Sequence, residues 1–377
     1  MPVEPVPTLR GLRVLLVGPV PPPAGGMAGQ TLQLCELLRD AGASVELLPT
    51  NAPYKPAWLG QIRGVRAIAR LLPYLWRLWR GCARSDVVHL MANSGWSWHL
   101  FCAPAIWVAW LRRTPIVVNY RGGEADAFLS RSASSVRAAM RRAACLVVPS
   151  GFLEHVFAKH GMSAQVVPNI IDLQRFHPAA KALPGDERRM MVARNLEPIY
   201  DNATAIKAFA RVVEQCPEVR LTIAGTGAEA TALEALAVQL GIANRVDFAG
   251  RVERNEMAAR LRQCSIAINP SLVDNMPNSV LEALASGVPV VSTRVGGVPY
   301  IVEDGSTALL VPAGDADAMA AAILRLLKDP DLAERLVRAG LRDVARYTWT
   351  RVGPVLAEVY RASMAGRARP PVTRKAN

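Results

Sequence analysis

The sequence lacks the features that mark disulfide-bonded, zinc-binding and membrane-spanning proteins. Its six cysteines are scattered over 377 residues, with no C-x-x-C pair and no histidine at ligand spacing. This pattern predicts reduced thiols in a cytoplasmic protein without a metal site. The most apolar stretch, residues 96–113, contains His99 and Pro104, and its apolar part of about 16 residues falls short of the ~20 that a transmembrane helix needs. We expect a buried or surface-docked helix there.

Acidic residues are scarce in the first half of the chain. Residues 1–178 contain 19 Lys and Arg against 9 Asp and Glu, whereas the remaining residues contain 25 and 22. A basic half suits an anionic partner, such as nucleic acid, anionic lipid or a phosphate-bearing substrate, and it also suits a merely solubilising surface. Residues 63–84 interleave Arg with Leu, Trp and Tyr, which is typical both of a helix on an anionic membrane and of an ordinary covering helix.

Short apolar runs alternate with helical segments along most of the chain, from RVLLVG onward. Strands that are apolar on both faces indicate parallel sheets covered by helices on both sides. The pattern stops at 172–188, the predicted linker, and then restarts. We therefore expect two tandem doubly wound α/β domains with a ligand-binding cleft between them. The expected parts are an N-terminal domain at 1–178, a C-terminal domain at 179–345, a helix at 346–365 packing on the N-terminal domain, and a basic flexible tail at 366–377.

The segment SLVDNMPNSVLEALASGVPVV contains two carboxylates, Asp274 and Glu282, after the buried strand SIAINPS. Ser279 and Glu282 have the spacing of a capping box, and Gly287 suits the end of the helix. This gives Glu282 a structural role but leaves DNMPN unexplained. Ligands of open α/β sheets bind beyond the carboxyl ends of strands, where helix N-termini attract phosphate. Because an ionised carboxylate only accepts hydrogen bonds, the alternative is a ligand with both phosphate and sugar hydroxyls.

Two glycine-containing turns are candidate ligand sites. The stretch LTIAGTGAEATALEAL places Gly225 and Gly227 between a strand and a helix, with Asp247 about 20 residues further on, which has the form of a dinucleotide fingerprint or of a plain turn. The stretch PVPPPAGGMAGQ places Gly25 and Gly26 before the first helix, where backbone amides can face phosphate or sugar.

Polar side chains follow several predicted strands. Arg121 ends VVNYR and is followed by two glycines; its guanidinium suits a departing diphosphate, or it pairs with Glu124 or Asp126. Arg194 ends MMVAR at the mouth of the second domain. His89, at the end of DVVHL, is either a structural or a cleft residue. The other residues that we expect near an acceptor are Asn93, Asn119, Tyr120 and Glu124.

Over residues 12–360, and most specifically over 250–313, the chain resembles the retaining family-4 glycosyltransferases of the GT-B fold. The matching features are the acid-x7-Glu motif and the segments ALASGVPVV and VGGVPYIVEDGSTALLVP, with their spacing. The resemblance implies two Rossmann-like domains, an acceptor in the first, a nucleotide-diphosphate sugar in the second, and no metal or further cofactor. With the basic first half, it predicts a glycan or polyprenyl-linked acceptor on the cytoplasmic face of a membrane, as in cell-surface polysaccharide assembly, and no nucleic-acid partner.

The resemblance also implies roles for single residues. Glu282 binds the ribose of the donor, Asp274 touches the transferred sugar, and Arg194 contacts the diphosphate. The nucleobase lies along Arg251 and Val252. The other donor-binding residues that we expect are Gly25, Gly26, Gly225, Gly227, Asn275, Met276, Pro277, Asn278 and Ser279.

Three departures from the family pattern stand in the sequence. The first acid of the motif is Asp274, where the family usually has Glu. Ile199, Tyr200 and Asp201 stand where a second diphosphate-binding Lys is usual, and Arg121 stands where many members have His. We infer that Arg121 supplies the missing positive charge. The alternatives are an NAD-dependent oxidoreductase built on the G-T-G turn, and a catalytically silent nucleotide-sugar-binding protein.

Overall fold

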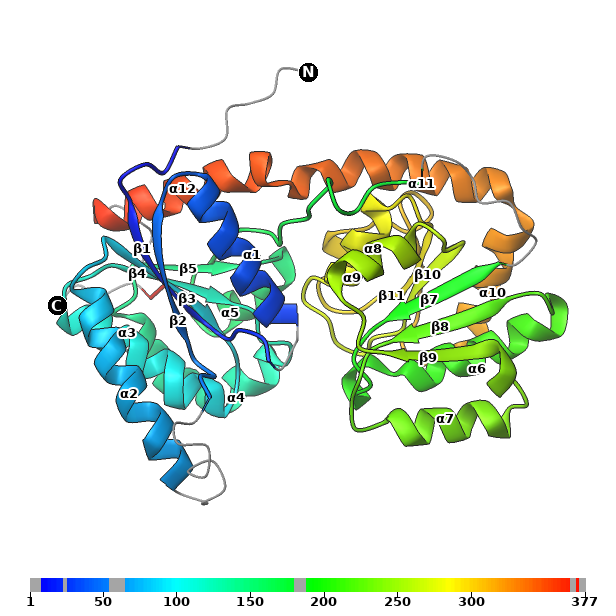
Figure 1. Cartoon of the computed structure of the whole chain (residues 1–377), viewed down its shortest axis with the longest axis horizontal. Coiled ribbons are helices and arrows are strands. Elements are labelled where there is room, and N and C mark those ends of the chain that lie inside the picture. Colours follow the sequence, from blue (N-terminus) through cyan, green and yellow to red (C-terminus); the bar gives the residue numbers. More distant parts are fainter. Residues whose placement is uncertain (1–7, 23–25, 54–64, 180–187, 367–370, 373–377) are drawn as a thin grey trace. The chain divides into compact units, whose positions relative to one another are not determined.

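A computed structural model describes residues 8–22, 26–53, 65–179, 188–366 and 371–372 (Figure 1). The chain divides into two compact units, the first formed by residues 1–169 with 349–377 and the second by residues 170–348. Each unit contains a six-stranded sheet whose strand pairs are parallel, and helices cover both faces of it (Figure 1). This architecture confirms the doubly wound α/β class.

The sheet of the first unit has the order β2-β1-β3-β4-β5-β6. Each strand is a short run of β-branched and other apolar residues, as a sheet covered on both faces requires. The strands are β1 (Arg13–Gly18), β2 (Ser44–Pro49), β3 (Val87–Ala92), β4 (Ile116–Tyr120), β5 (Cys145–Val148) and β6 (Gln165–Val166). The helices are α1 (Gly26–Asp40), α2 (Val65–Cys82), α3 (Ala103–Leu111), α4 (Ala125–Met140), α5 (Gly151–Lys159) and α12 (Trp349–Met364), with a π-helix at Trp98–Cys102.

The sheet of the second unit has the order β12-β11-β10-β7-β8-β9, so the winding reverses between the central neighbours β7 and β10. Its strands are β7 (Arg189–Ala193), β8 (Arg220–Ala224), β9 (Val246–Gly250), β10 (Ile266–Asn269), β11 (Val290–Thr293) and β12 (Leu309–Val311). Its α-helices are α6 (Asn202–Gln215), α7 (Ala230–Gln239), α8 (Arg254–Leu261), α9 (Asn278–Ala285), α10 (Ala316–Lys328) and α11 (Pro330–Val344). Short 3₁₀ turns lie at Pro198–Tyr200, Ala243–Arg245, Val298–Tyr300 and Ala345–Tyr347.

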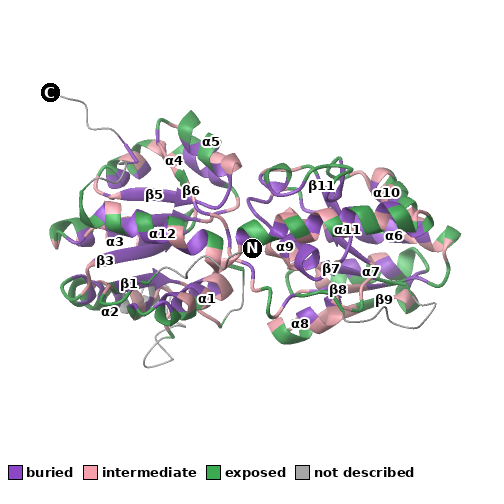
Figure 2. Cartoon of the chain, turned by 90° about the horizontal axis from the view of Figure 1, so that it is seen from above, coloured by how far each residue is buried: buried purple, intermediate pink, exposed green. Residues whose placement is uncertain are grey.

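The cores lie between the sheets and their covering helices, and the central strands are buried along their length (Figure 2). In the second unit one apolar cluster joins the sheet to α6, α7 and α10, and a separate cluster joins it to α8 and α9. All six cysteines are free thiols, as expected.

The first unit ends at Asn169, before the expected boundary at residue 178, and the chain returns to it at Trp349. The predicted linker begins at residue 172, but Phe176 is buried in the core of the second unit and that unit begins at Ile170. Within the predicted flexible tail, Val372 is buried in the core of the first unit, and Pro371 accepts a hydrogen bond from the Ser163 amide at 2.8 Å. The rest of that tail, apart from Gly366, lies outside the described residues, as do residues 180–187 of the linker.

The two stretches with membrane-like composition form separate helices that pack on each other, α2 and α3. Among the described residues, no helix combines the length and the apolar character that crossing a membrane requires. Each helix instead buries one face and leaves tryptophans exposed on the other.

Candidate active site

The reversal point between β7 and β10 brings two of the predicted catalytic residues together. Arg194 directly follows β7, and the loop after β10 carries Asp274 back to it. The two side chains form an ion pair that is about nine-tenths buried, with exposed fractions of 11% and 10%. Arg194 Nε also donates a hydrogen bond to Asn269 Oδ1 at 2.7 Å. In open α/β sheets ligands bind beyond the carboxyl ends of the strands at this point of the topology.

The carboxyl group of Asp274 is held by several donors. Burial raises its pKa, whereas Arg194 and the backbone amides of Asn275 and Met276 oppose that rise. The Gly297 amide donates to the Asp274 carbonyl at 2.8 Å, which attaches the loop to the segment after β11. Asn275 and Met276 are buried, and their amides serve Asp274 in this structure.

Sequence reasoning missed the residue that organises this loop, Asn269. Its Nδ2 donates to Ser292 Oγ at 2.9 Å, and its Oδ1 accepts from Ser271 Oγ at 2.9 Å as well as from Arg194. Thr293 Oγ1 donates to the Ser271 carbonyl at 2.6 Å. The available signal was a polar residue at the end of the buried run SIAINPS, which would be costly there without hydrogen-bond partners.

Helix α9 begins two residues earlier than the capping-box prediction requires. Its N-cap is Pro277, without a side-chain cap, and Ser279 lies inside the first turn. The Ser279 hydroxyl is buried and has no hydrogen-bond partner among the described residues. The capping box is therefore wrong. Gly287 does end the helix, with a φ of 69° in the left-handed region that favours glycine.

Glu282 is released from the capping role and lies partly buried on α9. Burial raises the pKa of its carboxyl group to about 7, although Arg254, Arg194 and Arg175 act in the opposite direction. A desolvated carboxylate near several arginines is suited to bind ligand hydroxyls.

Of the residues that replace the family's usual Lys, Tyr200 packs against Arg194. The Arg194 guanidinium carbon lies 5.2 Å from the centre of the Tyr200 ring, a cation–π distance. Asp201 adopts a left-handed φ of 41° and caps α6, accepting from the Thr204 hydroxyl at 2.7 Å. This segment therefore packs against Arg194 and starts a helix.

The G-T-G turn is explained by close backbone packing. A Cβ atom on Gly225 would lie 1.9 Å from the Arg194 carbonyl oxygen, and one on Gly227 would lie 2.1 Å from that of Leu196. Asp247, the acidic partner of the dinucleotide fingerprint, is exposed and lies 3.5 Å from Arg260. The turn thus holds the segment after β7 in place.

Of the residues expected at the nucleobase, Val252 is partly buried, and Arg251 forms an exposed ion pair with Glu253 at 2.9 Å.

The first unit gathers polar side chains around Arg121. Its NH1 donates to Gln30 Oε1 of α1 at 2.8 Å and to Asn169, and its Nε donates to Asn119 Oδ1 at 2.9 Å. Burial lowers the pKa of Arg121 to about 10. Asp126, one of the two carboxylates weighed as a partner of Arg121, pairs instead with Lys159 and His160, at 3.1 and 3.0 Å.

The residues expected near the acceptor separate into two groups. Asn93 and Glu124 are exposed, whereas His89, Asn119 and Tyr120 are at most 2% exposed. Tyr120 packs on Phe157 and its hydroxyl lies 2.8 Å from Ser94 Oγ. In this structure these three buried side chains support Arg121 and the core, and their contact with an acceptor stays a prediction. Gly26 begins α1, and Gly25 lies outside the described residues.

Two family models match consecutive parts of the chain. "Glycosyltransferase Family 4" matches residues 24–175 and "Glycosyl transferases group 1" matches residues 174–343. A D-inositol 3-phosphate glycosyltransferase of Streptomyces avermitilis is 32% identical over 58% of this chain and 50% of its own length. A phosphatidyl-myo-inositol mannosyltransferase of Mycolicibacterium smegmatis is 27% identical over 89% of this chain and 90% of its own. The chain spans about half the length of the first of the curated relatives that it matches.

Solved structures share the fold. The sucrose-phosphate synthase of Thermosynechococcus elongatus superposes with a TM-score of 0.76 over 94% of this chain and 99% of its own, at 22% identity. HepE of Anabaena, in complex with UDP, superposes with a TM-score of 0.71 over 93% of this chain and 100% of its own, at 17% identity. Both structural similarities concern the fold alone.

Proposed function

Because the chain belongs to the family-4 glycosyltransferases of the GT-B fold, we propose that it transfers a sugar from a nucleotide-diphosphate sugar to a glycan or lipid-linked acceptor with retention of configuration. The observation that carries this proposal is the Arg194–Asp274 pair at the reversal point of the second sheet, with Glu282 on the adjacent helix. The HepE structures hold UDP and UDP-glucose, which makes UDP-sugars the first donors to test.

In the proposed reaction, the bond from the anomeric carbon to the diphosphate breaks and the diphosphate leaves with the electron pair. The acceptor hydroxyl attacks on the same face, and its proton passes to a departing phosphate oxygen. Arg194 stabilises the growing negative charge, an effect that is often the largest in such catalysis. Arg121 of the first unit is proposed to contact an anionic group of a substrate. Glu282 accepts hydrogen bonds from donor hydroxyls, and Asp274 contacts the transferred sugar. No side chain is assigned as a nucleophile, and no metal ion or cofactor is part of the proposal.

We expect a nucleotide-diphosphate sugar, and not NADH, to raise the melting temperature of the protein. A ligand at 100 times its dissociation constant adds about 2.7 kcal/mol of stability. A thermal-shift screen of UDP- and GDP-sugars with NADH as comparison checks this, and the anomeric signal of a transferred product distinguishes an enzyme from a silent binding protein. A shift with NADH alone would favour the oxidoreductase alternative.

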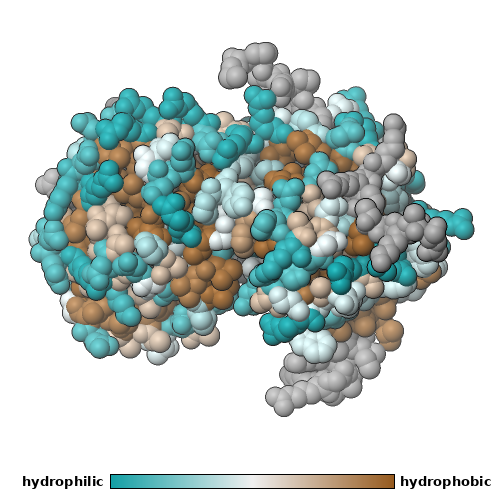
Figure 3. Space-filling model, turned by 180° about the vertical axis from the view of Figure 1, so that it is seen from behind, coloured by the Kyte–Doolittle hydropathy of each residue, from teal (hydrophilic) through white to brown (hydrophobic). Residues whose placement is uncertain are grey.

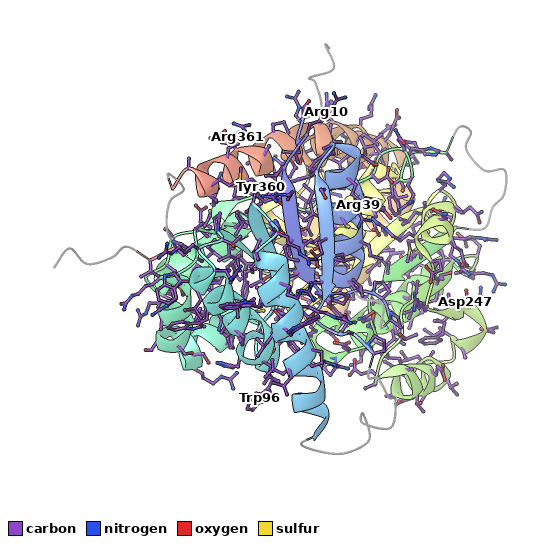
Figure 4. All side chains as sticks on the ribbon, turned by 60° about the vertical axis from the view of Figure 1, so that its left-hand side comes forward. Arg10, Arg39, Trp96, Asp247, Tyr360 and Arg361 are labelled. Atoms are coloured by element: carbon purple, nitrogen blue, oxygen red, sulfur yellow. The ribbon has the colours of Figure 1, made fainter. Side chains whose placement is uncertain are left out.

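We propose further that the first unit docks on an anionic membrane through an aromatic surface. This surface consists of exposed side chains on α2 and α3: Leu72, Trp76, Trp79, Trp107, Trp110 and Leu111. Arg142 lies 3.5 Å above the Trp107 ring, and residues 65–113 contain seven arginines and a single acid, Asp86. Tryptophans flanked by arginines are typical of helices at the interface of anionic bilayers. Figure 3 shows hydrophobic and hydrophilic residues interspersed on one face of the molecule, and Figure 4 labels Trp96, which is also exposed.

Replacing Trp76 and Trp110 with serine is expected to abolish co-sedimentation with vesicles that contain phosphatidylglycerol. Binding of the unaltered protein should weaken as salt rises, because screening reduces the arginine contribution. Tyr300→Ser, an exposed aromatic residue of the second unit, is the matched control and should bind normally. Equal binding of the double variant and the control would contradict the docking surface.

A further inference from the structure

A row of buried polar side chains connects the C-terminal helix to Arg121. Tyr360 of α12 places its hydroxyl 2.8 Å from His89 Nδ1, and His89 Nε2 lies 3.0 Å from Asn119 Nδ2. Asn119 Oδ1 in turn accepts from Arg121 Nε at 2.9 Å. Tyr360 and His89 are fully buried, whereas the neighbouring Arg361 is exposed; both α12 residues are labelled in Figure 4.

The hydrogen-bonding chemistry gives this row a single direction. A guanidinium group only donates, so Asn119 presents its oxygen to Arg121 and its NH₂ group to His89. Nε2 of His89 must therefore accept. Turning the Asn119 amide around would place its NH₂ group against Arg121 Nε, two donors facing each other inside the protein.

The imidazole of His89 is neutral, and this determines which of its two nitrogens carries the proton. Burial, assisted by the charge of Arg121, lowers the pKa of His89 to about 3. A neutral imidazole that accepts at Nε2 carries its proton on Nδ1. That proton is donated to the oxygen of Tyr360, whose pKa burial raises, so that its hydroxyl stays protonated.

We propose that Tyr360 is a positioning residue for Arg121: by accepting from His89 Nδ1–H it selects the imidazole tautomer that orients Asn119 and thereby directs the guanidinium group. Gln30 and Asn169 hold NH1 of the same guanidinium, while Asn119 holds Nε. The proposal rests on the proposed function in one respect, namely that Arg121 acts on an anionic group of a substrate. It links the reaction to a helix 271 residues away from His89 in the sequence.

The test compares Tyr360→Phe with Tyr74→Phe, since Tyr74 is also buried in the first unit and donates to the Phe101 carbonyl at 2.9 Å. In Tyr360→Phe the Nδ1 proton loses its acceptor, so the ¹⁵N signals of His89 should shift toward the Nε2–H tautomer. The Arg121 Nε–H signal should move with them. We expect kcat to fall about tenfold, the effect of one lost hydrogen bond, with a nearly unchanged KM for the donor.

Asn119→Asp is a second test variant, and it also provides a reference spectrum for the Nε2–H tautomer of His89. A carboxylate accepts from both neighbours, so this variant should force Nε2–H and make the Tyr360 hydroxyl the donor. If Tyr360→Phe keeps the Nδ1–H signal and the Arg121 signal of the unaltered protein, or if its turnover falls no more than that of Tyr74→Phe, the proposal is overturned. If the signals move as expected while the unaltered protein transfers no sugar, the positioning stands and the proposed function fails.

Discussion

Replacing Glu282 with glutamine is expected to weaken donor binding about 10- to 100-fold, because hydrogen bonds to a charged acceptor contribute roughly 1.5–3 kcal/mol. The carboxylate does not cap α9 and lies desolvated near three arginines, which suits it to accept hydrogen bonds from a ligand. Calorimetric titration of the variant with the donor found by screening measures this loss. Glu256→Gln, at an exposed position of α8 in an ion pair with Arg260 at 2.9 Å, is the control and should bind normally.

The pH dependence of stability and of donor affinity tests the role of Glu282 independently. The folded protein keeps the Glu282 proton between the ordinary pKa of 4.5 and the raised value of about 7, where the unfolded chain has lost it. Stability therefore falls as pH rises through this window, by up to about 3 kcal/mol. Glu282→Gln should be the more stable form at pH 8 and similar to the unaltered protein at pH 4. Donor affinity of the unaltered protein should rise from pH 6 to pH 8, and that of the variant should not.

A structural role for Glu282 predicts the opposite outcome. If the carboxylate stabilised the turn, its replacement would lower the melting temperature at pH 8 and leave the affinity of the folded fraction unchanged. The two observables move in opposite directions under the two hypotheses. One variant at two pH values is therefore enough to separate them.

The strands and their order of appearance could be predicted because each is a local property of the sequence. RVLLVG and SVELLP form β1 and β2 at the expected residues. The end of β3 could not be placed in this way. His89 looked like a strand end, but β3 continues to Ala92, which puts His89 inside the sheet. A single polar residue can be tolerated mid-strand when distant partners satisfy it, and Tyr360 is such a partner.

The error at Ser279 has a different physical origin. The spacing S-x-x-E is compatible with a capping box and also with two residues inside a helix. Pro277 has a φ of −66° and a ψ of 116°, the extended conformation of an N-cap, and α9 therefore begins at Asn278. The Arg194–Asp274 pair was beyond sequence reasoning for another reason. Its formation depends on β7 and β10 being neighbours, which is a property of the sheet order.

Replacing Arg194 with methionine is expected to lower turnover by about 10²- to 10³-fold, the usual effect of removing one preorganised charge-stabilising group. The same change leaves Asp274 as a buried carboxylate without its cation, and breaking a buried pair in this way costs about 3–5 kcal/mol. Loss of stability and loss of turnover are therefore confounded in the single variant. Asp274→Asn has the converse defect, since it leaves the Arg194 cation buried beside Asn269.

The double variant, Arg194→Met with Asp274→Asn, separates the two effects. Without either charge, much of the stability lost in the single variants should return, because the desolvation cost of an unpaired ion is gone. Turnover should stay at the level of Arg194→Met, since no cation faces the departing diphosphate. Denaturant unfolding and steady-state turnover of all four proteins measure the coupling free energy and the catalytic loss. Arg260→Met, which breaks an exposed pair with Asp247 at 3.5 Å, should change stability by at most about 0.5 kcal/mol. Recovery of turnover together with stability would mean that Arg194 serves the fold and that another group stabilises the diphosphate.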